Sequence, residues 1–304
     1  MPQRARHAGL SAGAADKVPC QGELGVKKNC TSKLLPFVKI GATEVTRLII
    51  GGNPFSGFSH ASTARDDEMV SYYTASNIMK AWDTAVENGI NTVQCRGDRH
   101  IRRLYREYRE RGGSAQWIAQ TASEMRDLAA NIAQIAAVGP VAIYHHGTHT
   151  DSLWHNGRIN EARDVVKAIH DRGLPAGIGT HMPEVVQYME ERGWEPDFYM
   201  CCLYNLSRTE KKFVAVDSDP YSKEVYLDED RDAMTAVIRQ VKKPCLAFKA
   251  LAAGRKTASA AEVENAFAYA YANIKPTDAV VVGVFQRDRN EIAMNAKIVR
   301  ELLG

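Results

Sequence analysis

The stretch Ile78-Met-Lys-Ala-Trp-Asp-Thr-Ala-Val-Glu-Asn-Gly-Ile-Asn-Thr-Val-Gln-Cys95 joins a helix pattern directly to a strand pattern. Its first part carries an apolar stripe at Ile78, Trp82 and Ala85, which is the spacing of an amphipathic helix. Its last part, Asn91–Cys95, is a short run typical of a β-strand. The same alternation of amphipathic helices with short β-branched runs continues along the chain and predicts parallel βαβ units.

Eight strands are expected between these helices. They are Arg47–Gly51, Asn91–Cys95, Ala115–Gln120, Val141–His145, Ala176–Thr180, Phe198–Leu203, Cys245–Lys249 and Ala279–Val284. Two connections, Asn53–Tyr73 and Ser207–Asp230, are too long for plain turns, and such connections often form lids or binding elements. Ser259-x-x-Glu262 matches a capping box at the start of a helix, and Asp288-x-x-Glu291 matches the same pattern.

Length and composition favour a single enzyme-sized domain with a short arm before it. The 304 residues are 45% hydrophobic and 25% charged, as in water-soluble enzymes. No apolar run reaches the roughly 18 residues that span a bilayer, so no membrane segment is expected. Residues 37–304 carry a net charge close to zero, which argues against a nucleic-acid partner and favours a small-molecule ligand.

Residues 1–36 form the arm by composition. They contain six Lys or Arg against two Asp or Glu, and their Ala, Gly and Lys content predicts a flexible or irregular segment. The arm lacks the apolar run of a secretory signal, and a mitochondrial-type presequence is the alternative interpretation. The six cysteines show neither CxxC spacing nor the density of a disulfide scaffold, which favours a reducing, cytoplasmic location.

Five segments of the chain resemble the aldo/keto reductase family. Phe37–Asn53 resembles the N-terminal hairpin and first barrel strand of that family, and Ala85–Asn91 resembles the end of its first helix. Tyr204–Leu206, Phe248–Gly254 and Gly283–Asn295 resemble the segments at its sixth, seventh and eighth strands. The resemblance implies that the chain beyond the arm folds as a (β/α)8 TIM barrel, with the site at the C-terminal ends of its strands.

The catalytic residues of this family are largely replaced. Its reductases use an Asp, a Tyr, a Lys and a His, but Gln94 stands where the Asp is expected and Gln120 where the Lys is expected. No Tyr lies at the expected offset, since the nearest, Tyr105, belongs to a helix pattern. Only the His remains, as His145. Without a Lys beside a Tyr the usual proton donor to a carbonyl is missing, so robust reduction of ordinary aldehydes with NADPH is not expected.

The resemblance also implies a nicotinamide-nucleotide site that is partly altered. Phe248 lies where the family stacks an aromatic ring on nicotinamide, and Asn295 matches an Asn on the adenine side. Glu291 stands where an Arg usually holds the 2′-phosphate, and a carboxylate there would repel that phosphate. Arg287 and Arg289 are close enough in sequence to compensate. NADP is the cofactor in this interpretation, with expected contacts at Asn295, Gly283 and Arg287.

Histidines collect at the expected strand ends. His145 and His146 end the fourth strand and His181 follows the fifth, so His145 or His146, His181 and the thiolate of Cys201 could meet at ligand distance, with Asp98 or Asp151 near them. Such a set suits Zn²⁺, or Mn²⁺ with more carboxylate. In the alternative interpretation the histidines bond loops or substrate hydroxyls, and Cys201 is an ordinary core thiol.

Lys249 follows an apolar strand and is expected at the mouth of the barrel. A desolvated Lys can act as a general base or form a Schiff base, or it can pair with a carboxylate. The cationic turn from Arg96 to Arg103 could hold a phosphate or carboxylate at a helix N-terminus, or be a solvated face. Catalytic roles are expected for His145, Lys249, His181 and Asp98. Expected substrate contacts are Arg96, His100, His146, Tyr204, Asn205 and Phe248.

Three functions remain open. The favoured one is an isomerase, epimerase or lyase of a sugar-like or keto-acid substrate, in which a His or a His-bound metal polarises a carbonyl while His or Lys249 moves the α-proton. The alternative is a divergent NADP-dependent oxidoreductase that uses His145 as the polarising group. The third is a non-catalytic barrel that binds a ligand or partner. The fold alone does not choose among them.

Overall fold

The computed structural model describes residues 35–208 and 224–304. Two expectations therefore fall partly outside the described residues, namely the arm of residues 1–36 and the long connection Ser207–Asp230. Within the described residues no helix is long and apolar enough to cross a membrane.

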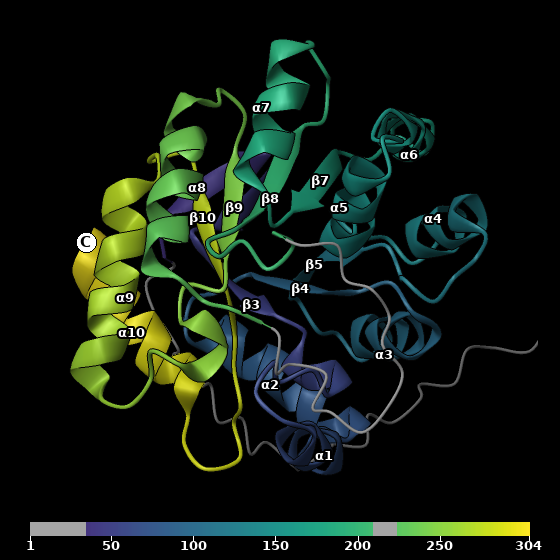
Figure 1. Cartoon of the computed structure of the whole chain (residues 1–304). Helices are drawn as coiled ribbons and strands as arrows, with labels where there is room; N and C mark the ends of the chain where they lie inside the picture. The colour runs from purple at the N-terminus through teal and green to yellow at the C-terminus, as the bar shows by residue number, and fades with distance from the viewer. Residues whose placement is uncertain (1–34, 209–223) are drawn as a thin grey trace, which may run out of the picture. The chain divides into compact units, whose positions relative to one another are not determined.

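Eight parallel strands close into a barrel with helices between them, which confirms the expected (β/α)8 TIM barrel (Figure 1). Around the barrel the order is β10-β3-β4-β5-β6-β7-β8-β9, so each strand pairs with its neighbours in sequence and β10 pairs with β3. Every strand lies within one residue of its expected boundaries. The strands are β3 (Leu48–Gly51), β4 (Thr92–Arg96), β5 (Gln116–Gln120), β6 (Ala142–His145), β7 (Ala176–Thr180), β8 (Phe198–Cys202), β9 (Cys245–Phe248) and β10 (Ala279–Gly283).

The helices cover the outside of the barrel (Figure 1). They are α1 (Thr63–Tyr72), α2 (Ala75–Glu87), α3 (Arg99–Glu110), α4 (Leu128–Ala136), α5 (Gly147–His155), α6 (Glu161–His170), α7 (Pro183–Glu191), α8 (Asp228–Gln240), α9 (Ala260–Asn273) and α10 (Glu291–Leu303), with short 3-10 turns η1 (Pro54–Ser56) and η2 (Ala252–Gly254). The connection Asn53–Tyr73 is thus not a plain loop, because it contains η1 and α1.

Two helix starts test the expected capping boxes. Ser259 caps α9, because its hydroxyl accepts the backbone N–H of Glu262 at 3.2 Å, which confirms the first pattern. The second predicted capping box is wrong, because α10 begins at Glu291 and its cap is Asn290 rather than Asp288. Glu291 is therefore the first helical residue of α10.

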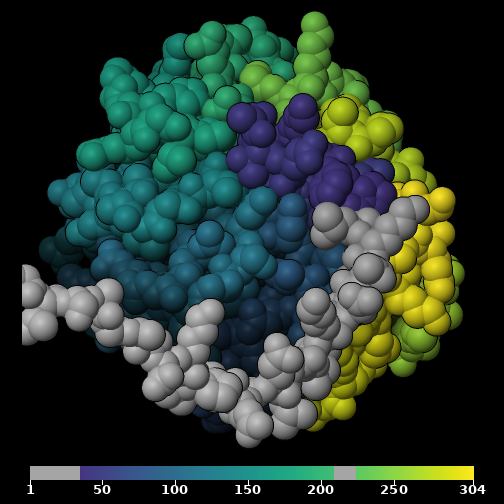
Figure 2. All heavy atoms as spheres, turned by 180° about the vertical axis from the view of Figure 1, so that it is seen from behind, coloured from purple at the N-terminus to yellow at the C-terminus, as the bar shows by residue number. Residues whose placement is uncertain are grey.

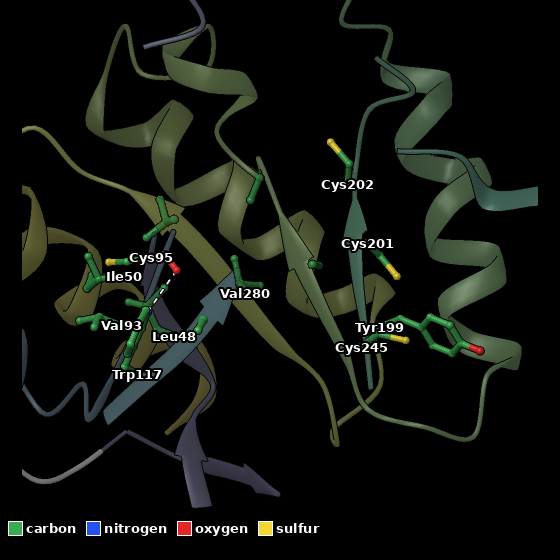
Figure 3. Close-up of a cluster of buried hydrophobic side chains, with 14 of the residues drawn as sticks. Leu48, Ile50, Val93, Cys95, Trp117, Tyr199, Cys201, Cys202, Cys245 and Val280 are labelled. Atoms are coloured by element: carbon green, nitrogen blue, oxygen red, sulfur yellow. Dashed lines mark hydrogen bonds between the residues drawn. The ribbon is translucent and has the colours of Figure 1, made fainter. Parts of the chain in front are cut away.

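Strand residues alternate between two apolar layers, because successive side chains of a strand point to opposite faces. The layer inside the barrel includes Ile49, Ile118, Ala142, Phe198, Leu246 and Val281. The layer between the strands and the helices includes Leu48, Ile50, Val93, Cys95, Trp117 and Val280 (Figure 3). This alternation decides which residue at a strand end faces the barrel mouth and which faces the helices.

The hairpin of β1 (Phe37–Ile40) and β2 (Thr43–Thr46) covers the N-terminal end of the barrel. In Figure 2 this hairpin is the purple segment. Its turn requires Gly41, which has φ +58° and whose added Cβ would lie 2.7 Å from Cγ of Pro175. The hairpin residues that join the inner layer are Val38, Ile40 and Val45.

The barrel domain starts two residues earlier than expected, at Leu35. The expected arm ends at residue 36, but the Leu35 side chain is only 1% exposed and belongs to the outer layer. Its backbone N–H donates to the carbonyl of Gly89 at 3.1 Å, and the carbonyl of Pro36 accepts the N–H of Arg47 at 2.8 Å. Leu35 and Pro36 therefore belong to the barrel domain.

Leu35→Ala is expected to lower the free energy of unfolding by about 2–5 kcal/mol, since truncating a buried Leu removes apolar contacts and leaves a cavity. Phe37→Ala is the matched control, because Phe37 is 41% exposed and its loss is expected to cost about 0.5 kcal/mol. Chemical denaturation of the full chain and both variants measures the difference. Equal effects of the two substitutions would contradict a core role for Leu35.

Candidate active site

A cavity of about 720 Å³ opens at the C-terminal ends of the barrel strands. Its walls are the segments that follow β3, β9 and β10. The volume lies in the range of small-molecule sites, about 300–1,000 Å³. The strand residues at its base are Gln94, Gln120, Tyr144, Met200 and Val281.

Gln120 and Tyr144 form a neutral pair at the base of this cavity. The Nε2 of Gln120 donates to the hydroxyl of Tyr144 at 2.9 Å. Burial raises the pKa of Tyr144, so its hydroxyl stays protonated at physiological pH. The base of the cavity therefore offers hydrogen bonds rather than charge.

His145 does not reach the cavity. Along β6 the side chains alternate, so Tyr144 belongs to the inner layer and His145 points to the helices. His145 is 2% exposed, and its Nδ1 lies 2.9 Å from Oγ1 of Thr150 in α5. Burial, and then the charge of His149, lowers the pKa of His145 to about 4. The expectation that His145 polarises a substrate carbonyl is corrected, since the residue of β6 that lines the cavity is Tyr144.

Cys201 also faces away from the barrel mouth. It packs in the outer layer beside Cys245, on the neighbouring strand (Figure 3). A hydrogen bond with Cys245, and burial, raise the pKa of the Cys201 thiol, which disfavours a thiolate ligand. Among the residues that the structure describes, no three His, Cys, Asp or Glu side chains could hold a metal ion together. The expected metal set of His145, His181 and Cys201 is therefore not supported.

His181 directly follows β7 and is held by Asp151 of α5. Its Nδ1 lies 2.6 Å from Oδ2 of Asp151, and this carboxylate also accepts hydrogen bonds from the hydroxyls of Thr180 and Ser207. Burial opposes ionisation of Asp151, but these hydrogen bonds and the charge of His181 outweigh it and lower the pKa of the carboxyl. The His181 ring contacts Phe248, which lines the cavity, with 5.6 Å between ring centroids.

Lys249 directly follows β9 and lines the cavity. Its φ of +64° lies in the left-handed region, which is costly for a residue with a Cβ. Its Nζ donates to the hydroxyl of Tyr226 at 3.3 Å, and that hydroxyl donates to Glu224 at 2.8 Å. Strain of this kind persists where the surrounding structure fixes it, and it gathers at ligand sites.

His60 is the site residue that the sequence interpretation missed. It lies in the connection Asn53–Tyr73 and lines the cavity. Its Nδ1 lies 3.0 Å from Oε1 of Glu224, and its Nε2 lies 3.2 Å from Nδ2 of Asn53. Burial, and then the charge of Lys249, lowers the pKa of His60 to about 4, although Glu224 acts in the opposite direction. The composition of the connection indicates a binding element but does not single out His60.

The two His–carboxylate pairs come from opposite sides of the barrel. His60 follows β3 and His181 follows β7, and three strands separate β3 from β7 in either direction around the barrel. The two rings are close enough for their charges to interact, because His181 contributes to the lowered pKa of His60. His60 and Lys249 line the cavity, whereas His181 does not line it and meets its wall through the ring of Phe248.

Residues of the cationic turn lie beside the cavity. Asp98 caps α3, since its carboxylate accepts the backbone N–H of Ile101 at 2.8 Å. His100, the second residue of α3, is exposed. The guanidinium of Arg96 lies over the ring of Phe58, 5.1 Å from its centroid, and Phe58 lines the cavity. Asp98 is therefore a helix cap, and Arg96 contacts the cavity wall from outside.

Three further expected substrate contacts support the surrounding loops. The backbone N–H of His146 donates to Oγ1 of Thr121 at 3.0 Å, and the side chain of Asn205 accepts the N–H of Ser207 at 3.2 Å. The hydroxyl of Tyr204 is buried and has no hydrogen-bond partner among the described residues. Within the described part of the chain, none of these three side chains lines the cavity, whereas Phe248 does.

The expected cofactor residues separate into two groups. Gly283 lines the cavity at the end of β10, where an added Cβ would lie 3.1 Å from Pro54. Asn295 is buried in α10, and Arg287 is exposed and pairs with Asp288 at 2.8 Å. Of these three expected cofactor contacts, only Gly283 lies at the cavity.

Positive side chains outnumber negative ones around the cavity. Arg65, Lys249, Arg255 and Arg289 line it, together with the carboxylate of Glu291. Arg289 pairs with Glu291 at 3.3 Å, so Arg289 rather than Arg287 is the cation beside that carboxylate. The surplus of positive charge favours an anionic ligand.

Solved structures resemble this chain in fold. Aldo-keto reductase AKR11C1 from Bacillus halodurans, in its holo form, has a TM-score of 0.58 at 11% identity, over 89% of this chain and 95% of that chain. Gox0644, as the apo form and as a mutant in complex with NADPH, has a TM-score of 0.54 at 8% identity, over 89% of this chain and 94% of that chain. No family model matches the sequence, and no curated protein matches it. The likeness therefore shows the (β/α)8 barrel fold alone.

Acid is expected to destabilise the barrel through His145. Its pKa is about 4 in the folded chain against 6.5 for an ordinary His, so the unfolded chain binds more protons between these values. The stabilisation present above about pH 6.5 is therefore lost as the pH falls toward 4. Chemical denaturation at several pH values in this range is expected to show that the free energy of unfolding falls less steeply with falling pH in His145→Gln than in the natural chain. The exposed His100→Gln is the control, and an unchanged slope in His145→Gln would contradict the assignment.

Proposed function

We propose that the chain is an enzyme that moves a proton on a carbon next to a carbonyl group, as an isomerase, epimerase or lyase of a sugar-like or keto-acid substrate. The observation that carries the proposal is the two histidines at one barrel mouth, each bonded through Nδ1 to a carboxylate. A carboxylate behind an imidazole fixes its tautomer and stabilises the imidazolium that forms when the ring takes a proton. The Nε2 of His181 is thereby suited to acid–base catalysis, whereas the Nε2 of His60 is bonded to Asn53.

The three groups have different parts in this reaction. With Nδ1 of His181 held by Asp151, its Nε2 is the nitrogen that takes the α-proton. The ammonium of Lys249 stabilises the oxygen that gains negative charge as the carbonyl becomes an enolate. His60 is neutral at physiological pH because burial lowers its pKa to about 4, and its two ring nitrogens are bonded to Glu224 and Asn53, so its part is to shape the cavity wall beside Lys249.

The outer part of the cavity supports an anionic substrate such as a keto acid. The guanidinium of Arg65 lies 4.4 Å from the centroid of the Phe285 ring, and that of Arg255 lies 4.0 Å from the centroid of the Tyr226 ring. Stacking on a ring holds a guanidinium plane in place, and a planar guanidinium suits a carboxylate. Arg289 adds a third guanidinium to the cavity wall.

Exchange of α-hydrogens for deuterium tests the proposal. The probes are pyruvate, hydroxypyruvate and dihydroxyacetone in D2O, and loss of the α-C–H signal is followed by proton NMR with and without the protein. His181→Asn and Lys249→Met are each expected to slow the protein-dependent exchange by about 10²–10⁴-fold, since this is the usual cost of losing a positioned acid–base or charge-stabilising group.

His170→Asn is the matched control, because His170 forms another His–carboxylate pair, with Asp197 at 2.8 Å, at the opposite end of the barrel: His170 ends α6 before β7, and Asp197 directly precedes β8. The control is expected to keep the exchange rate. Melting temperatures within a few degrees of the natural chain show that each variant folds. Equal rates in His181→Asn and His170→Asn would remove His181 from the mechanism, and no exchange with any probe would count against α-proton transfer.

A second candidate function, an NADP-dependent oxidoreductase, is favoured by the extent of the cavity. It continues past Phe248 to Gly283 and Arg289, and the similar Gox0644 mutant structure is a complex with NADPH. NADPH would supply a hydride if bound here, and Phe248 and Arg289 would be the residues to hold it. Tyr226 and Lys249 form a Tyr–Lys pair. Burial raises the pKa of the Tyr226 hydroxyl, however, so this hydroxyl gives up its proton less readily than that of an ordinary Tyr.

NADPH fluorescence tests this second function directly. If NADPH binds with a phosphate near Arg289, Arg289→Ala is expected to weaken binding about tenfold, since an exposed charge contact is worth on the order of 1 kcal/mol. Glu291→Gln is expected to strengthen binding, because it removes a like charge beside the phosphate. If NADPH is titrated into the natural chain up to millimolar concentration and the fluorescence does not change, the second function is contradicted.

A further inference from the structure

A second hollow lies on the outside of the barrel, between α3 and α4, which follow one another along the chain (Figure 1). This α3–α4 groove has a volume of about 740 Å³ and shares no lining residue with the cavity at the strand ends. Helix α3 contributes Arg99, Arg102, Arg103, Arg106, Glu107 and Glu110. The facing wall, from the end of α4, is uncharged and consists of Gln134, Ala137 and Val138.

Positive charge is concentrated on this helix. The segment Arg96–Arg111 contains seven arginines and three carboxylates, although residues 37–304 are close to neutral as a whole. The buried face of α3 is apolar, with Ile101, Leu104 and Tyr105, so its arginines lie on the opposite, outer side. The groove is therefore a local positive surface on a nearly neutral barrel.

The arginines of the groove repel one another. Within residues 35–208 and 224–304, none of Arg99, Arg102, Arg103 and Arg106 forms an ion pair with a carboxylate. Burial, and then the charge of Arg99, lowers the pKa of Arg102, and Arg106 acts in the same direction. Like charges on adjacent turns of a helix are unfavourable, and a bound anion would relieve this repulsion.

We propose that the α3–α4 groove is a docking site for an acidic segment of a partner protein. Planar guanidinium groups bind carboxylates through paired hydrogen bonds, and Ala137 and Val138 give the apolar side chains of such a segment a surface to contact. The lined part of α3 is about 16 Å long at 1.5 Å per residue, which corresponds to about five residues of extended chain.

The carboxylates in the groove favour a protein segment over a nucleic acid. Glu107 and Glu110 lie at the C-terminal end of the arginine row. A continuous phosphate backbone would bring negative charge against both of them, whereas a peptide can place a neutral or basic residue there. The charge along the groove thus matches a segment that is acidic at one end only.

Fluorescence anisotropy with the fluorescein-labelled peptide Glu-Glu-Glu-Gln-Gln, which is acidic at one end only, tests the docking site, using the full chain at low ionic strength. The natural chain is expected to bind this probe with a dissociation constant in the micromolar range. The triple variant Arg99→Gln, Arg103→Gln, Arg106→Gln is expected to bind it at least about tenfold more weakly, since three charge contacts are lost. These three side chains are exposed, so the variant is expected to melt at the temperature of the natural chain.

The matched control is the triple variant Arg158→Gln, Arg172→Gln, Arg192→Gln, which removes the same charge from exposed arginines elsewhere. It is expected to bind the labelled peptide as the natural chain does. Equal weakening in both triple variants would show an effect of net charge and overturn the proposal. No binding by the natural chain would overturn it, as would tighter binding of a labelled oligothymidine that is lost in the groove variant.

Discussion

Successive side chains of a β-strand point to opposite faces, and in a closed barrel one of these faces is the interior. In β6 this places Tyr144 at the base of the cavity and turns the adjacent His145 toward α5. The same alternation puts Gln120 at the cavity and Cys201 in the outer layer. The strands therefore supply a neutral, hydrogen-bonding base, and the charged groups of the described residues that line the cavity come from the segments that follow the strands.

Those segments bring ionisable groups into a site of low solvent access, where each needs a partner. Asp151 shows how this is achieved, because it accepts hydrogen bonds from the hydroxyl of Thr180, the ring of His181 and the hydroxyl of Ser207. One carboxylate of α5 thus joins the end of β7 to the segment after β8. Glu224 has a similar place, since it binds His60 from the connection after β3 as well as Tyr226, two residues along its own segment. The buried carboxylates fix the loops and the histidines together.

Most of the barrel could be predicted from sequence, because β-branched runs and helical stripes are local patterns, and β7 matches its expected range Ala176–Thr180 in full. His181 and Lys249 could be predicted as well, since each directly follows a strand. The choice between Tyr144 and His145 could not, because it depends on strand register, which a one-residue shift inverts. His60 could not be predicted as a site residue for another reason. Its partner Glu224 is 164 residues away along the chain, and the two come together only in the folded barrel.

The left-handed backbone of Lys249 has an evolutionary consequence. At φ +64° a residue with a Cβ carries a conformational cost of about 1–2 kcal/mol that glycine does not. Drift to glycine at this position would make the barrel more heat-resistant and would remove the ammonium from its mouth in the same step. Selection for robustness and selection for chemistry therefore act on Lys249 in opposite directions.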